Sequence, residues 1–191
     1  MKTIRTLVII LFAIVPSITI AQSEVLSPAR MRAVDSLALE KIRDLGKYIA
    51  VIGNKSTSFS EGERVVQRAM ELFADNSQMG VSSLSRPEVE YYPVREYFKR
   101  LMALNYDRVE IDWYDVHYIS NLEKQPDGKF VGVITIFQRF EGTSADGLNY
   151  KDTTKKDITV YIERKQIQIG GRLVEFWDVL LGDVKVTETT A

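Results

Sequence analysis

The segment WYDVHYIS, residues 113–120, contains the only histidine of the 191-residue chain. Alternate side chains of a β-strand share a face, so Trp113, Asp115, His117 and Ile119 are expected to point the same way. An aspartate that orients an imidazole would make His117 a general base. Same-face neighbours lie ~6.5–7 Å apart along a strand, however, which is too far for a direct hydrogen bond without side-chain reach. We therefore favour a polar end of a strand over a catalytic pair.

The two tryptophans, Trp113 and Trp177, extend this set of candidate residues. Tryptophan mostly supplies buried apolar area, so a place in the core is the first interpretation. The alternative is a stacking wall for a flat ligand. The candidate ligand-binding residues are therefore Trp113, Asp115, His117 and Trp177.

A cluster of lysines in the run YKDTTKKD is a weaker candidate site. Lys151, Lys155 and Lys156 could bind a phosphate or a sulfate. Because Asp152 and Asp157 interrupt the positive charge, we favour a solvated strand end. The paired glycines of IGGR precede no helix, so they predict a turn and not a phosphate loop. No GxSxG, HExxH or calcium-loop pattern is present.

The absence of cysteine excludes disulfides, thiolate metal ligands and a lipoprotein anchor. With one histidine as well, the sequence predicts no metal site and no cofactor. A basic start, an apolar run at 7–15 and small residues before Gln22 are typical of a secretory signal peptide. The run is shorter than the ~20 residues that span a membrane. Cleavage is expected between Ala21 and Gln22, with export to the periplasm or the medium and no membrane span in the mature form.

Residues 22–186 are long enough for one domain with its own core, and 187–191 (TETTA) are expected to form a loose polar tail. Removal of the leader with its two basic residues leaves 23 basic side chains against 26 acidic ones, a net charge near −3. This balance gives no electrostatic attraction to nucleic acid.

Apolar residues spaced three and four apart predict three helices before any long strand. The first follows Ser27 and Pro28, the second follows a capping box at Ser60 and Glu63, and the third starts at Pro93. After Asn105 the period changes to two. Long strands are expected at 106–119, 130–140, 157–165 and 173–181, joined by Gly-bearing turns as an antiparallel meander. A short strand is expected at 79–84. The class is therefore α+β, with three helices packed on a curved sheet.

This order of elements resembles the nuclear-transport-factor-2-like superfamily, which has a cystatin-like cone fold. In that fold a curved sheet wraps the first helix and leaves a pocket at the open end. The stretches YDRVEIDWYDVHYISNL, DGKFVGVITIFQRFEG and FWDVLLGDVKV are also similar to uncharacterised exported members of the superfamily from Gram-negative bacteria. The superfamily contains ketosteroid isomerases, polyketide cyclases and dehydratases as well as binding domains, so the resemblance does not fix a function. No residue matches a catalytic motif of these enzymes.

Strands such as FVGVITIF and LVEFWDVLL are apolar on both faces, although helices can cover only one face of the sheet. We therefore expect a homodimer through the sheet, with either Phe176 or Trp177 pointing outward. The leading hypothesis is an exported, non-catalytic domain that binds a small apolar ligand or an envelope protein. The alternatives are a cofactor-free isomerase, cyclase or dehydratase that uses Asp115 and His117, and a structural subunit of an envelope assembly.

Overall fold

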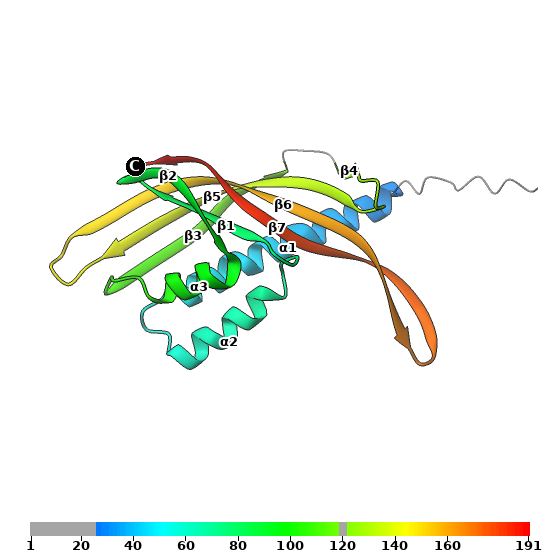
Figure 1. Cartoon of the computed structure of the whole chain (residues 1–191), viewed down its shortest axis with the longest axis horizontal. Helices are drawn as coiled ribbons and strands as arrows, with labels where there is room; N and C mark the ends of the chain where they lie inside the picture. The colour runs from blue at the N-terminus through cyan, green and yellow to red at the C-terminus, as the bar shows by residue number, and fades with distance from the viewer. Residues whose placement is uncertain (1–25, 119–121) are drawn as a thin grey trace, which may run out of the picture.

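The computed structural model describes residues 26–118 and 122–191, in which three helices pack against a curved sheet (Figure 1). The predicted α+β class and the curved sheet are confirmed. The predicted signal peptide and Ile119 lie outside the described residues. Within them, no helix combines the length and the apolar character that a membrane crossing requires.

The first helix, α1 (Pro28–Gly53), begins and ends where the sequence predicts. The Ser27 hydroxyl accepts a hydrogen bond from the Arg30 amide at 3.3 Å, which satisfies one free donor of the first turn. Pro28 occupies the first helical position, where its missing N–H costs nothing. The apolar face is buried against the sheet, and its residues are Val34, Ala38, Ile42, Leu45, Ile49 and Ile52.

Helices α2 (Phe59–Met70) and α3 (Val94–Met102) follow. The predicted cap at Ser60 was wrong by two residues, because Ser58 caps α2 and accepts a hydrogen bond from the Glu61 amide at 3.3 Å. Ser58 and Glu61 have the same three-residue spacing as the predicted pair, so the sequence alone could not separate them. Pro93, the predicted start of the third helix, is the N-cap residue of α3, which begins one residue later.

Seven strands form one sheet among the described residues. The strands are β1 (Gln78–Ser83), β2 (Arg86–Pro93), β3 (Arg108–Tyr118), β4 (Glu123–Lys124), β5 (Phe130–Thr143), β6 (Asn149–Ile169) and β7 (Arg172–Thr190). Their order is β2-β1-β7-β6-β5-β3, with the short β4 also on β5. The predicted meander of four long strands is therefore confirmed. Strand β2 was not predicted, and β1 meets β7 in parallel, with Met79 opposite Val184.

Strands β6 and β7 are much longer than the predicted 157–165 and 173–181. Their polar ends continue the antiparallel ladder, and Thr153 lies opposite Thr190. The hydrogen bonds of the ladder join backbone groups and do not require apolar side chains. The strands therefore continue through the polar residues at which the prediction ended them. As a result, residues 187–190, which were expected in the loose tail, extend the sheet.

Two bulges bend β7 where it crosses the sheet. One adds Thr187 opposite Lys155 and Lys156, and the other lies at Gly182 and Asp183. The Asp183 carboxylate accepts a hydrogen bond from the Gln78 amide at 3.0 Å, which attaches the start of β1 to this bend. Bulges increase local twist and bending, so they account for the strong curvature of the sheet around α1.

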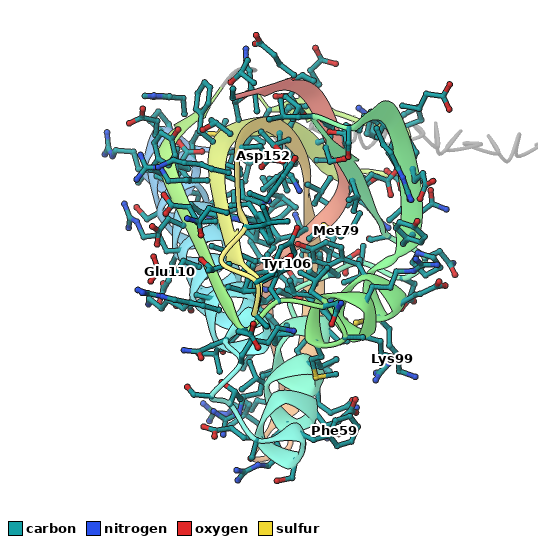
Figure 2. The ribbon with its side chains drawn as sticks, turned by 90° about the vertical axis from the view of Figure 1, so that its left-hand side faces the viewer. Phe59, Met79, Lys99, Tyr106, Glu110 and Asp152 are labelled. Carbon is teal, nitrogen blue, oxygen red and sulfur yellow. The ribbon has the colours of Figure 1, made fainter. Side chains whose placement is uncertain are left out.

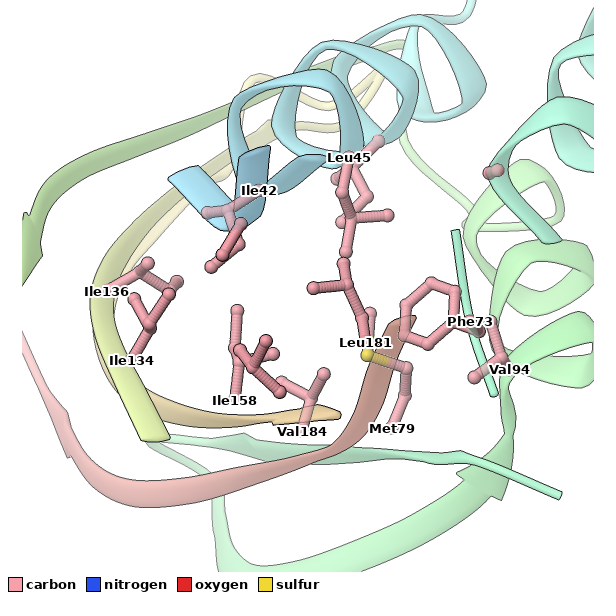
Figure 3. Packing of buried hydrophobic residues seen from close by; sticks show 14 of the residues in the cluster. Ile42, Leu45, Phe73, Met79, Val94, Ile134, Ile136, Ile158, Leu181 and Val184 are labelled. Atoms are coloured by element: carbon pink, nitrogen blue, oxygen red, sulfur yellow. The ribbon is translucent and has the colours of Figure 1, made fainter. Parts of the chain in front are cut away.

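The core lies between α1 and the concave face of the sheet (Figure 3). Strand residues that alternate along β5 and β6 meet the apolar face of α1, as the side chains of Ile42, Ile134, Ile136 and Ile158 show in the figure. Helix α3 adds Phe98, which is fully buried. The same concave face continues beyond the core toward the β5–β6 turn, where its side chains become polar.

A two-stranded arm projects from the other end of the sheet (Figure 1, lower right). Strand β5 pairs with β6 only as far as Ile162, so residues beyond it pair with β7 alone. The arm ends in the predicted turn at Gly170 and Gly171, with φ angles of 56° and 80°. Glycine adopts these left-handed angles at no steric cost, which suits a tight two-residue hairpin.

Candidate functional site

A cavity of about 390 Å³ lies between the β1–β2 hairpin, α3 and the concave face of β5 and β6. Its volume falls within the ~300–1,000 Å³ that small-molecule sites occupy. Nine of the twenty lining residues are apolar or aromatic: Val81, Tyr92, Tyr97, Leu101, Leu104, Tyr106, Ile111, Phe140 and Tyr150. Figure 2 looks toward this end of the molecule, with Asp152 and Tyr106 inside the arch of strands.

Polar side chains of β6 form the buried wall of this cavity. Strand alternation places Asp152, Thr154 and Lys156 on the concave face, in line with the core residues Ile158 and Val160. The exposed fraction is 4% for Asp152 and 2% for Lys156. A cation and an acid are thus nearly inaccessible to solvent, which is uncommon for charged side chains unless they are paired or used.

The Lys156 ammonium has few partners. Its Nζ donates a long hydrogen bond of 3.4 Å to the Gly80 carbonyl oxygen and lies 5.9 Å from the centre of the Tyr97 ring. Among the described residues, it forms no ion pair with a carboxylate. Burial lowers the pKa of Lys156 to about 8, although the negative charge of Asp152 opposes this shift. An ammonium with spare donors therefore faces the cavity at neutral pH.

The Asp152 carboxylate is paired with a tyrosine. The Tyr150 hydroxyl donates to Asp152 Oδ2 at 2.5 Å and accepts a hydrogen bond from the Leu84 amide at 2.9 Å. Burial raises the pKa of Asp152, while the Tyr150 hydrogen bond and the Lys156 charge lower it. Burial and the same hydrogen bond raise the pKa of Tyr150 to about 12. Asp152 thus retains acceptor capacity toward the cavity.

A glutamine of β5 completes the buried polar wall. Gln138 Oε1 accepts a hydrogen bond from the Trp113 indole N–H at 3.1 Å. This bond fixes the orientation of the amide, so its Nε2 is the group that remains to donate to a ligand. Tyr97 of α3 is also buried, and burial raises the pKa of its hydroxyl.

Two polar contacts at the rim of the cavity involve charged side chains of the lining. The Arg100 guanidinium stacks 4.0 Å from the centre of the Tyr92 ring and donates to Glu96 at 3.0 Å. The Tyr92 hydroxyl in turn donates to Glu90. These contacts leave Lys156 as the buried cation of the lining without a carboxylate partner among the described residues.

The structure separates the four residues that the sequence singled out. Tyr114 lies opposite Phe137 and His117 lies opposite Thr135. The chain advances three residues on β3 but only two on β5 between these pairs, so β3 contains one extra residue. This bulge includes Asp115, whose φ is 48°. It reverses the alternation, and His117 faces away from the side that Trp113 occupies. The expectation that Trp113, Asp115 and His117 share one face was therefore wrong.

Of these residues, Trp113 is nearest to the candidate site. Trp113 does not line the cavity, but its indole N–H donates a hydrogen bond to Gln138, which lines the cavity. Its side chain packs on α1, where a Cβ at Gly46 would lie 3.3 Å from the Trp113 Cβ. Asp115 and His117 are exposed and line none of this cavity. A functional role for either stays a prediction.

Trp177 lies at the base of the arm. Its ring packs edge-on against Phe130, with centroids 5.7 Å apart, and the Arg164 guanidinium lies 5.4 Å from its ring centre. It therefore contributes to the base of the arm and not to the cavity. Its neighbour Phe176 is on the opposite face and is 37% exposed, so Phe176 is the member of the pair that points outward.

The interpretation of YKDTTKKD as a solvated strand end was wrong for half of its side chains. Lys151 and Lys155 point away from the cavity, whereas Asp152 and Lys156 are buried in it. The signal was present in the sequence. Every second residue of the later part of β6 faces inward. The same step of two, counted back toward the start of the strand, reaches Lys156 and then Asp152.

Replacement of His117 by alanine is expected to change the free energy of unfolding by less than about 0.5 kcal/mol, because the side chain is exposed. Ligand binding in the cavity should also be unchanged, since His117 does not line it. Urea denaturation with circular dichroism measures the first effect. A loss of several kcal/mol would show that His117 supports the β3 bulge.

Comparisons with known proteins give only distant structural similarity. No protein-family model matches the chain, and no curated protein matches it. Similar solved structures include the Kfla4162 protein from Kribbella flavida, with 13% identity, a TM-score of 0.45, and coverage of 82% of this chain and 90% of that one. A hexachlorocyclohexane dehydrochlorinase (LinA) type 2 has 14% identity and a TM-score of 0.42, with coverage of 83% and 91%. Aln2 from a Streptomyces species has 11% identity and a TM-score of 0.36, with coverage of 83% and 94%. At these values none of the three indicates what this chain does.

Proposed function

We propose that the protein binds a small, flat and largely apolar molecule with an anionic oxygen group, in the cavity between α3 and β6. The observation that carries this proposal is the buried Lys156 ammonium, which has no carboxylate partner among the described residues. A ligand carboxylate or enolate would supply the missing charge, and charge-assisted hydrogen bonds are the stronger ones. The aromatic rings of the lining suit a flat ring system.

Three naphthalenes that differ only in their head group test this proposal: 2-naphthoate, 2-naphthylmethanol and 2-naphthylmethylamine. Isothermal titration calorimetry should give the tightest binding for the carboxylate and the weakest for the amine. In a Lys156→Met variant the preference for the carboxylate over the alcohol should fall on the order of tenfold or more. Lys155→Met is the matched control, because Lys155 points to the opposite face of β6. Equal affinity for all three head groups would contradict the proposal.

Cofactor-free catalysis, as by an isomerase, cyclase or dehydratase, is a second candidate. The observation in its favour is that Tyr150, Asp152 and Lys156 bring an acid, a base and a cation into one cavity. Solvent-deuterium exchange at the acidic C–H of 2-tetralone, followed by NMR, tests this candidate. Loss of exchange in Asp152→Asn would place the base in the cavity, whereas loss in His117→Ala would restore the sequence-based Asp115–His117 hypothesis.

We also propose that the protein is exported, on the basis of the leader pattern at residues 1–21. Mass spectrometry of the protein from its native host should give an N-terminus at or near Gln22. A retained leader would refute this localisation. Participation in an envelope assembly depends on export and stays a hypothesis with it.

A further inference from the structure

The arm formed by the ends of β6 and β7 has an unusually apolar tip. Leu173 is 70% exposed and Ile169 is 57% exposed, and Ile167 and Val174 beside them are also exposed. Cross-strand pairing places Ile167 opposite Val174 on one face of the ribbon, while Leu173 lies opposite Gln168 on the other. The tip therefore presents apolar side chains on both of its faces.

The end of the ribbon carries one charge. Between the cross-strand pair Ile167 and Val174, residues 167–174 contain one cation, Arg172, and no acidic residue. Arg164 and Lys165 make ion pairs toward the base of the arm with Glu175 and Asp178, at 3.3 and 2.7 Å. Arg172 adjoins the Gly170–Gly171 turn itself. An apolar end with an arginine beside its turn is complementary to acyl chains below anionic phosphate groups.

The turn at the opposite end of β6 has a different composition, so an apolar and basic composition is not a general property of the turns in this sheet. The β5–β6 turn exposes one large apolar side chain, Leu148, which is 68% exposed. Asp146 accepts hydrogen bonds there from the Ser144 hydroxyl at 2.6 Å and the Leu148 amide at 3.3 Å. That turn is acidic and hydrogen-bonded, whereas the tip of the arm has no described acid.

We propose that the tip of the β6–β7 arm inserts into a lipid surface, with Ile169 and Leu173 among the acyl chains and Arg172 at the phosphate groups. A protein that docks on one face of the ribbon would leave the other face exposed, but a lipid surface receives both. The arm projects beyond the helices, so its tip can reach a flat surface without the rest of the domain (Figure 1). This proposal is independent of the ligand in the cavity.

Vesicle flotation tests the proposal with the full mature chain, on phosphatidylcholine alone and on phosphatidylcholine with added phosphatidylglycerol. The unmodified protein should float with the mixed vesicles. An Ile169→Glu, Leu173→Glu double variant should lose on the order of tenfold or more in partitioning, because charged groups replace inserted apolar ones. Arg172→Gln should lose about fivefold on the mixed vesicles and little on phosphatidylcholine alone.

Leu148→Glu is the control, matched to Leu173→Glu alone, since it adds one negative charge at a similarly exposed apolar position of the other turn. It should float like the unmodified protein, and thermal unfolding should show that every variant is folded. The proposal is overturned if the unmodified protein binds neither vesicle, or if Leu148→Glu weakens binding as much as the double variant. It is also overturned if sedimentation gives a dimer that the double variant splits, because the arm would then serve the homodimer that the sequence predicts.

Discussion

A Lys156→Met variant is expected to be more stable than the unmodified protein at pH 7, by about 3 kcal/mol. Burial lowers the pKa of Lys156 from 10.5 to about 8, so the folded state holds its proton less tightly than the unfolded state. Each unit of this pKa difference lowers the free energy of unfolding by about 1.4 kcal/mol. The full destabilisation applies at pH values below 8, where Lys156 is charged in both states. Methionine fills similar space without a charge.

The pH dependence separates this effect from a change in packing. Between about pH 8 and 10.5 the unfolded state binds the proton and the folded state does not, so the free energy of unfolding of the unmodified protein should rise with pH. The variant should lack this rise. Above about pH 10 the raised pKa values of Tyr97 and Tyr150 act in the opposite direction, because the unfolded tyrosines ionise first.

Urea denaturation at a series of pH values between 7 and 9.5 measures both curves, and flat curves for both proteins would contradict the assigned cause. Lys155→Met, on the outward face of β6, should change stability by less than about 0.5 kcal/mol. The same variants report on binding. Lys156→Met should gain stability and lose its preference for a carboxylate ligand, which is the pattern of a residue kept for function at a cost in stability.

Phe98→Ala is expected to lower the free energy of unfolding by about 3–5 kcal/mol. Phe98 is fully buried in α3, and its ring lies 6.5 Å from that of Phe73 and 5.5 Å from that of Tyr97. The Phe73 contact joins α3 to the segment after α2, where Phe73 bridges to Leu181 of β7, and Tyr97 of α3 lines the cavity. Removing the ring leaves a void that such a packed neighbourhood can fill only in part.

Chemical denaturation with unchanged m-values would measure this loss. Phe59→Ala is the matched control, because Phe59 begins α2 in an exposed position and should matter little. A loss below about 1 kcal/mol in Phe98→Ala would show that α3 is not anchored through this ring. The cavity on the other side of Tyr97 would then have a wall that moves independently of the core.

The three helices and the four-strand meander were predictable because both rest on local periodicity. The face of α1 repeats every three or four residues from Val34 to Ile52, and the turn at Gly170 and Gly171 has a distinctive composition. Strand β2 was missed because its eight residues mix charged and aromatic side chains around Pro87. Its place depends on pairing with β1, which is a tertiary contact.

The candidate site was not found from the sequence for two physical reasons. A bulge at Asp115 reversed the alternation that was expected to bring His117 beside Trp113, and a bulge adds a residue without a clear sequence signal. Lysine is usually exposed, so the residue type predicted an outward Lys156, whereas the alternation along the strand predicted an inward one. The structure buries Lys156. In a strand that continues from the core, the alternation was the better guide.

Strand β6 carries the cavity near one end and the tip of the arm at the other, which constrains how related sequences can differ in length. Between Lys156 and Ile162 its residues alternate within the core, so one inserted residue would turn the apolar side chains outward. Beyond Ile162 only β7 is paired with it. Relatives of this chain should therefore gain or lose residues in the arm, by equal numbers on both strands, and keep the Lys156–Ile162 spacing fixed.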